Sequence, residues 1–114
     1  MIPSQPPSQP SEQSLLKTIL QPLLEDFAHW FDRSIQLLEN ESIGFLTVHD
    51  QNNLLARVKN AQQEVRAAQM LFNATDGQVG IEPSTMLTWH KLVGECWQVS
   101  TRFRQLPSSD RQPQ

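Results

Sequence analysis

Residues 15–40 read LLKTILQPLLEDFAHWFDRSIQLLEN, and this stretch decides the fold because its apolar residues recur at helical spacing. They form two neighbouring stripes. The first stripe comprises Leu16, Leu20, Leu23, Phe27, Trp30 and Leu37, with Ser34 as its one interruption. The second comprises Leu24, Ala28, Phe31, Ile35 and Leu38. An apolar face this broad predicts a helix that packs against two other helices.

Two residues bear on how this helix begins and continues. Ser11 is a suitable N-cap residue, so the helix is expected over about residues 11–40. Pro22 lacks a backbone N–H, and its ring clashes with the preceding turn. The sequence therefore predicts either a kink at Pro22 or a short separate helix before it.

Two further helices are predicted after a break at residues 40–46, which contain Gly44. Thr47 is placed to cap a helix over about residues 48–73, and Asn73–Gly77 is a stop signal. Small residues on this helix permit close helix approach. Its apolar face is Leu54, Val58, Ala61, Val65, Ala68 and Phe72. Pro83 suits the first turn of a third helix reaching about residue 106. That helix carries a coiled-coil-like heptad seam of Trp89, Leu92, Cys96, Val99, Phe103 and Leu106.

These elements predict an all-α fold, an up-down-up three-helix bundle over residues 11–106 in a single domain. Residues 1–10 contain four prolines among Gln and Ser, a composition that favours a disordered, solvated tail. Residues 107–114 are also polar and are expected to form a short C-terminal tail. The helical domain should therefore hold the whole core.

Composition and charge exclude several classes of function. The chain of 114 residues carries a formal net charge of -3, so it offers no basic field for nucleic acid or anionic lipid. No apolar run approaches the length of a bilayer, and the N-terminus lacks the basic and apolar regions of a secretory signal. Cys96 is the single cysteine, which favours a reducing compartment. We therefore expect a cytoplasmic protein with no membrane span and no nucleic-acid partner.

Residues capable of catalysis or metal binding are few and scattered. His29, His49 and His90 fall on three different segments and lack paired ligands at helical spacing, so no metal and no cofactor are expected. Cys96 lies in an apolar seam, where a thiol usually packs as a small apolar residue. Asp26, His29 and Arg33 share one face of the first helix, as solvated ion-pair residues often do. A small metal-dependent or thiol-dependent enzyme remains an alternative, but we expect no enzyme.

One surface of the third helix is the best candidate for binding a partner protein. Apolar residues beyond the heptad seam form an adjacent stripe that a three-helix core does not need. The candidate residues are Met86, His90, Val93 and Trp97, with Gly77 and Gly80 in the preceding loop. Trp97 is the first choice as a contact residue, because large aromatic side chains dominate interface energetics. The alternative is that this wide face simply meets the other two helices.

The Gly77-x-x-Gly80 spacing also occurs in the loop with which KH domains hold RNA. Here the neighbouring residues are Asp76 and Glu82, and the loop contains no Lys or Arg. The two glycines are therefore interpreted as a helix stop and a turn.

Three runs of sequence resemble a family of short cyanobacterial proteins known only as a domain of unknown function. The runs are LLKTILQPLLEDFAHWF, LLARVKNAQQEVRAAQMLFNATDGQVGIE and WHKLVGECWQVSTRFR, and together they extend the resemblance from Leu15 to Arg104. The family has no established catalytic residues to transfer to these positions. The resemblance implies a cytoplasmic, cyanobacterial setting and favours a role in photosynthetic or carbon-fixing assemblies.

Together these observations predict a non-enzymatic helical interaction protein, an assembly factor or regulator. The alternative from a different class is a structural homo-oligomer, in which the broad face of the first helix closes a larger helical bundle.

Overall fold

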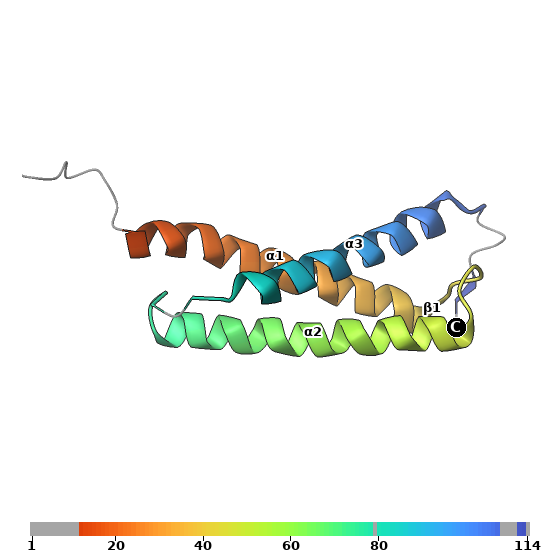
Figure 1. Cartoon of the computed structure of the whole chain (residues 1–114). Helices are drawn as coiled ribbons and strands as arrows, with labels where there is room; N and C mark the ends of the chain where they lie inside the picture. Colours follow the sequence, from red (N-terminus) through yellow and green to blue (C-terminus); the bar gives the residue numbers. More distant parts are fainter. Residues whose placement is uncertain (1–11, 79, 108–111, 114) are drawn as a thin grey trace, which may run out of the picture.

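The computed structural model describes residues 12–78, 80–107 and 112–113, and it forms three helices that run up, down and up (Figure 1). Helix α1 spans Glu12–Asn40, α2 spans Val48–Ala74 and α3 spans Pro83–Gln105. The predicted all-α three-helix fold is confirmed, and each helix end lies within one residue of its predicted position. None of the helices in the described ranges combines the length and apolar character needed to cross a membrane.

Helix α1 continues through Pro22, so the predicted alternative of a short separate helix does not form. Pro22 is exposed. The unbroken helix keeps both apolar stripes in register along its length.

The two apolar stripes of α1 differ in burial, which the sequence pattern did not indicate. Phe31 and Leu24 of the second stripe are completely or almost completely buried, and this stripe forms the centre of the core. The first stripe is mixed, since Phe27 is buried while Leu16 and Trp30 are exposed. Part of the broad face of α1 is therefore not covered by the other two helices.

The interface between α1 and α2 is closely packed. Val58 and Val65 are fully buried and Ala61 is nearly so, because small side chains let the two helix backbones approach each other. Gln62 is also buried, and its amide donates a hydrogen bond of 2.7 Å to Asp32 Oδ1. The amide nitrogen of this buried side chain thus has a hydrogen-bond acceptor.

Gln51 organises the connection between α1 and α2. Its buried side chain accepts a hydrogen bond from the Ile43 N–H at 3.1 Å. It also donates to the carbonyls of Leu38 and Glu41, at 2.9 and 2.8 Å. Thr47 caps α2 as predicted, since its hydroxyl accepts from the Asp50 N–H at 3.0 Å.

A two-residue strand, β1 at Glu41–Ser42, lies in this connection and pairs antiparallel with β2 at Gln112–Pro113. The polar composition of residues 107–114 predicted only a tail, so this contact is an addition that the sequence did not show. It places the end of the described chain beside the end of α1 (Figure 1).

The turn after α2 confirms the predicted helix stop. Asp76 and Gly77 both have positive φ angles, 53° and 79°, and the Gly77 N–H donates to the Phe72 carbonyl at 2.7 Å. The Lys17 ammonium lies 2.5 Å from Asp76, and its alkyl stem packs against Gly77. The start of α1 is thereby fixed to the end of α2.

Candidate partner-binding groove

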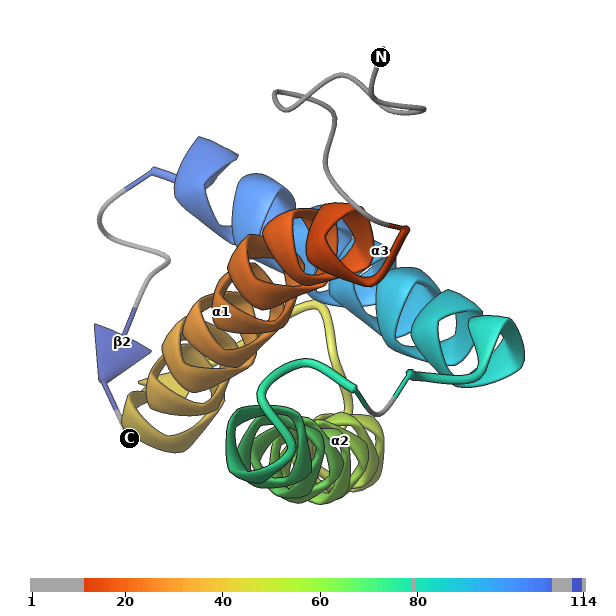
Figure 2. The same ribbon diagram turned by 90° about the vertical axis from the view of Figure 1, so that its left-hand side faces the viewer.

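Trp89 and Glu95 attach helix α3 to the other two helices. Trp89 is buried, meets Phe27 edge-on with ring centroids 5.5 Å apart, and donates from Nε1 to Glu64 at 3.2 Å. Further along, Arg57 of α2 makes two hydrogen bonds of 2.8 and 3.1 Å to Glu95. These contacts set the position of α3, which crosses the α1–α2 pair obliquely (Figure 2).

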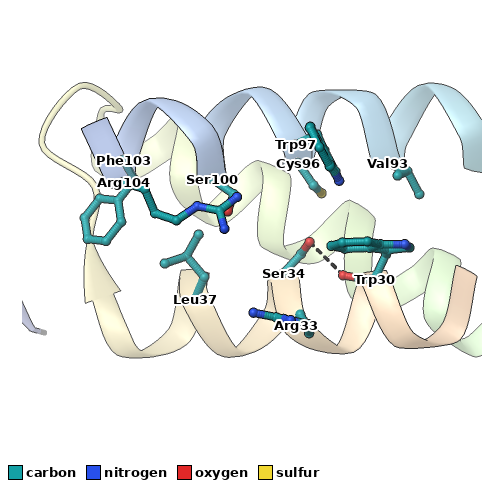
Figure 3. A pocket seen from close by; sticks show the side chains of 10 residues that line it. All are labelled: Trp30, Arg33, Ser34, Leu37, Val93, Cys96, Trp97, Ser100, Phe103 and Arg104. Atoms are coloured by element: carbon teal, nitrogen blue, oxygen red, sulfur yellow. Dashed lines mark hydrogen bonds between the residues drawn. The ribbon is translucent and has the colours of Figure 1, made fainter. Parts of the chain in front are cut away.

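A groove opens between α1 and the second half of α3. Trp30 of α1 and Trp97 of α3 meet edge-on with ring centroids 6.0 Å apart, yet they are 37% and 52% exposed. Beside them lies a cleft of about 350 Å³, which we call the Trp30–Trp97 groove (Figure 3). Its lining is Trp30, Arg33, Ser34, Leu37, Val93, Cys96, Trp97, Ser100, Phe103 and Arg104.

The groove is hollow because large and small side chains alternate along it. The two indoles keep the helices apart, while the small side chains of Ser34, Cys96 and Ser100 do not fill the space beside them (Figure 3). The Ser34 hydroxyl donates to the Trp30 carbonyl at 2.8 Å, within its own helix. Ser34, the one interruption of the first stripe, thus lies where the packing fails.

A second, shallower hollow lies on the other side of Trp97, on the outer face of α3. Its lining is His90, Val93, Gly94, Trp97, Gln98, Thr101, Arg102 and Gln105. A Cβ atom added at Gly94 would meet nothing within 4 Å, so this part of α3 is accessible to an approaching chain. Trp97 and Val93 line both hollows, and the two form one continuous surface.

Only some of the predicted binding residues meet at this surface. His90, Val93 and Trp97 line it, whereas the half-buried Met86 packs against the core. The loop holding Gly77 and Gly80 precedes α3. Because Trp97 lies fourteen residues into that helix, the helix rise places the loop about 20 Å from it. The predicted stripe and the predicted loop are therefore separate features.

Sequence reasoning missed the contribution of α1. Trp30, Arg33 and Ser34 complete the groove, but the stripe pattern assigned Trp30 to the buried face of α1. The interruption at Ser34 was the available signal, because a polar residue in an apolar stripe marks a place where the stripe does not face a core.

Cys96 and the three histidines are the side chains that the sequence analysis considered for catalysis or metal binding. Burial raises the pKa of the Cys96 thiol, a hydrogen bond with Ser34 opposes this shift, and Glu95 adds to it. A thiol with a raised pKa stays protonated at neutral pH and is a poor nucleophile. His29, His49 and His90 are all exposed, and the described residues contain no cluster of three or more His, Cys, Asp or Glu side chains able to hold a metal.

The comparisons with known proteins identify a family and no activity. A family model described as "Protein of unknown function (DUF2605)" matches residues 10–105. The chain belongs to this family. No curated protein and no solved structure matches it.

Proposed function

We propose that this member of the DUF2605 family is a non-enzymatic interaction module that binds a protein partner through the Trp30–Trp97 groove. The observation that carries the proposal is the pair of touching indoles that remain half exposed beside a cleft. Tryptophan side chains dominate binding energy when a partner covers them, because they offer a large apolar area with one polar edge. Covering this pair would remove that area from water.

The framework around the groove supports this role. Trp89 and the Arg57–Glu95 pair fix α3, so both indoles stand on helices already held in place. Binding to a preorganised surface loses less conformational freedom than binding to a mobile loop. The cleft also falls in the size range in which proteins receive an inserted side chain or small ligand.

The cellular setting belongs to the same proposal. The resemblance to short cyanobacterial proteins supports a cytoplasmic assembly factor or regulator that serves photosynthetic or carbon-fixing complexes. On this view the partner is a subunit or helper of such a complex.

Affinity capture from the native organism, followed by mass spectrometry, tests the proposal. The wild type is compared with Trp97→Ala and with Leu87→Ala, a matched control because Leu87 is 53% exposed on the same helix but outside the groove. We expect a partner recovered by the wild type and Leu87→Ala to be lost with Trp97→Ala. With purified partner, loss of a contact worth about 2 kcal/mol raises the Kd about 30-fold. Equal recovery by all three folded proteins would contradict the proposal.

A homo-oligomer is the second candidate, and a different surface favours it. Leu15, Leu16 and Ile19 at the start of α1 are each about half exposed. A second copy covering these residues would close a larger bundle. Light scattering across a concentration series would then show a rising mass that Ile19→Glu abolishes. A monomer at every concentration would reject this candidate.

A metal-dependent or thiol-dependent enzyme would contradict the non-enzymatic part of the proposal. Stoichiometric metal in protein purified from the native organism would be the first sign of a metal-dependent protein.

A further inference from the structure

We infer that the Trp30–Trp97 groove receives an acidic segment of the partner, a helix that carries carboxylates about two turns from an apolar residue. The inference rests on the proposed function and specifies the chemistry of the partner. The inference follows from the positions of the basic side chains that have no carboxylate partner within the described residues.

Among the described residues, every basic side chain away from the groove and its neighbouring hollow, except Lys91, is paired with a carboxylate. The described ion pairs are Lys17–Asp76 at 2.5 Å, Arg57–Glu95 at 2.8 Å, Lys59–Glu39 at 2.9 Å and Arg66–Asp32 at 3.8 Å. Within residues 12–78, 80–107 and 112–113, four basic side chains have no carboxylate within 4.0 Å. They are Arg33, Lys91, Arg102 and Arg104, and three of the four line the groove or the hollow beside it.

The arginines flank the exposed tryptophan from both sides. Arg33 and Arg104 line the groove from α1 and α3 respectively, and Arg102 lines the outer hollow. Arg102 is also held over the Phe45 ring, 4.2 Å from its centroid, which limits its freedom. Neither hollow is lined by any Asp or Glu. On a chain with a net charge of -3, this surface is both apolar and positive.

The spacing on α3 indicates the spacing on the partner. Arg104 follows Trp97 by seven residues, which is two helical turns or about 10 Å along the axis. A partner helix lying along the groove would meet the indole with an apolar residue and the guanidinium with a carboxylate about seven residues away. Arginine suits this contact because its planar fork can hold a carboxylate with two hydrogen bonds.

Other occupants fit this surface less well. Nucleic acid and anionic membranes require a broad basic field, whereas here single arginines alternate with apolar residues on an acidic chain. A second copy docking by the same face would set its own arginines against these, and like charges oppose association. An acidic protein segment matches both the apolar groove and its charge.

A peptide-display selection tests the inference without knowledge of the partner. Random 16-residue peptides are selected on the full chain after depletion on Trp97→Ala, and the enriched peptides are sequenced. We expect Asp and Glu to be enriched beside apolar residues at helical spacing.

The best peptide is then synthesised and titrated by calorimetry against the wild type, Arg33→Gln/Arg104→Gln and Lys91→Ala. Lys91 is an exposed, unpaired cation on α3 outside both hollows, so it controls for a change in net charge. We expect the double variant to raise the Kd at least 10-fold while Lys91→Ala changes it less than twofold. Added salt should weaken wild-type binding more than binding by the double variant.

The outcomes separate this inference from the proposed function. Peptides that require Trp97 but show no acidic enrichment, or that bind the double variant as tightly as the wild type, would overturn the inference and leave the groove as a binding site. A selection with no Trp97-dependent peptide would overturn both. Binding of a 24-base-pair DNA duplex or of phosphatidylglycerol vesicles that depends on Arg33 and Arg104 would also overturn the inference. Circular dichroism spectra matching the wild type establish that each variant is folded.

Discussion

The two interfaces of α1 are both lined by apolar side chains, but one is closed and the other leaves a groove. Toward α2, the small residues Val58, Ala61 and Val65 let the helices close, and every one of them is buried. Toward the second half of α3, Trp30 and Trp97 meet early and keep the helices apart, so a groove remains. Large side chains at a helix contact can therefore leave a gap between the helices when the side chains beside them are too small to fill it.

This difference assigns separate roles to the two interfaces. The α1–α2 interface supplies stability, because its apolar surface is already removed from water. The groove between α1 and α3 leaves apolar surface exposed, and we propose that a partner covers it. The predictions below test that division from the largest expected effect to the smallest.

Removal of an aromatic side chain should lower the stability of the protein strongly in the closed core and only slightly in the groove. Phe31→Ala should lower the free energy of unfolding by about 3–5 kcal/mol, because Phe31 is fully buried and a cavity remains. Trp97→Ala should cost about 1 kcal/mol or less, because half of its surface is already in water. Urea denaturation measures both. A cost for Trp97→Ala equal to that for Phe31→Ala would show that the groove is part of the core.

Gln51→Leu should lower the free energy of unfolding by about 2 kcal/mol, because the buried Ile43 N–H loses the acceptor that Gln51 provides. Gln63→Leu on the exposed face of α2 is the control and should change stability by less than about 0.5 kcal/mol. Thermal unfolding followed by circular dichroism distinguishes them. Equal melting temperatures for the two variants would rule out this role for Gln51.

Ala61→Leu should destabilise the protein by about 1–3 kcal/mol, because the added carbons have no room between α1 and α2. The exposed Ala67 provides the matched control, since Ala67→Leu adds the same atoms in solvent. Urea denaturation compares the two. Tolerance of Ala61→Leu would mean that the closed interface is looser than its burial indicates.

Gly94→Ala should stabilise α3 by about 0.5–1 kcal/mol, because alanine has a higher helix propensity than glycine and its methyl group would meet no neighbouring atom. Gly94→Leu should fold equally well but should reduce binding of the selected acidic peptide, because the added side chain occupies the outer hollow. Urea denaturation and calorimetry measure the two effects. Unchanged binding by Gly94→Leu would confine the site to the Trp30–Trp97 groove.

Asp76→Asn should change the acid sensitivity of the protein slightly. The Lys17 ammonium holds the pKa of Asp76 below its ordinary value of 3.8, so the unfolded chain binds more protons than the folded one near that pH. The pair therefore contributes stability above about pH 3.8 and loses it as the pH falls through the lowered pKa. Melting temperatures at acidic and neutral pH measure the effect. Identical pH profiles for wild type and variant would show that the pair contributes nothing.

Much of the fold followed from local pattern. The stripes of α1, the small face of α2 and the Pro83 start of α3 predicted three helices with nearly correct bounds. Only the α3 side of the candidate site was predicted from the sequence. Trp97, Val93 and His90 were named there, whereas Trp30 and Arg33 of α1 were not. A helical stripe shows which residues share a face, but it does not show how far along that face another helix follows.

The sequence by itself determined the helices, their order and their apolar faces, because these depend on spacing and on residues close together in the chain. Tertiary structure alone decided that Pro22 leaves α1 unbroken, that Gln51 closes the α1–α2 connection, and that Trp30 faces a groove rather than the core. The position of Trp30 depends on the crossing of α3 over α1 and on which side chains meet first there. Such contacts join residues more than sixty positions apart, so no local pattern records them.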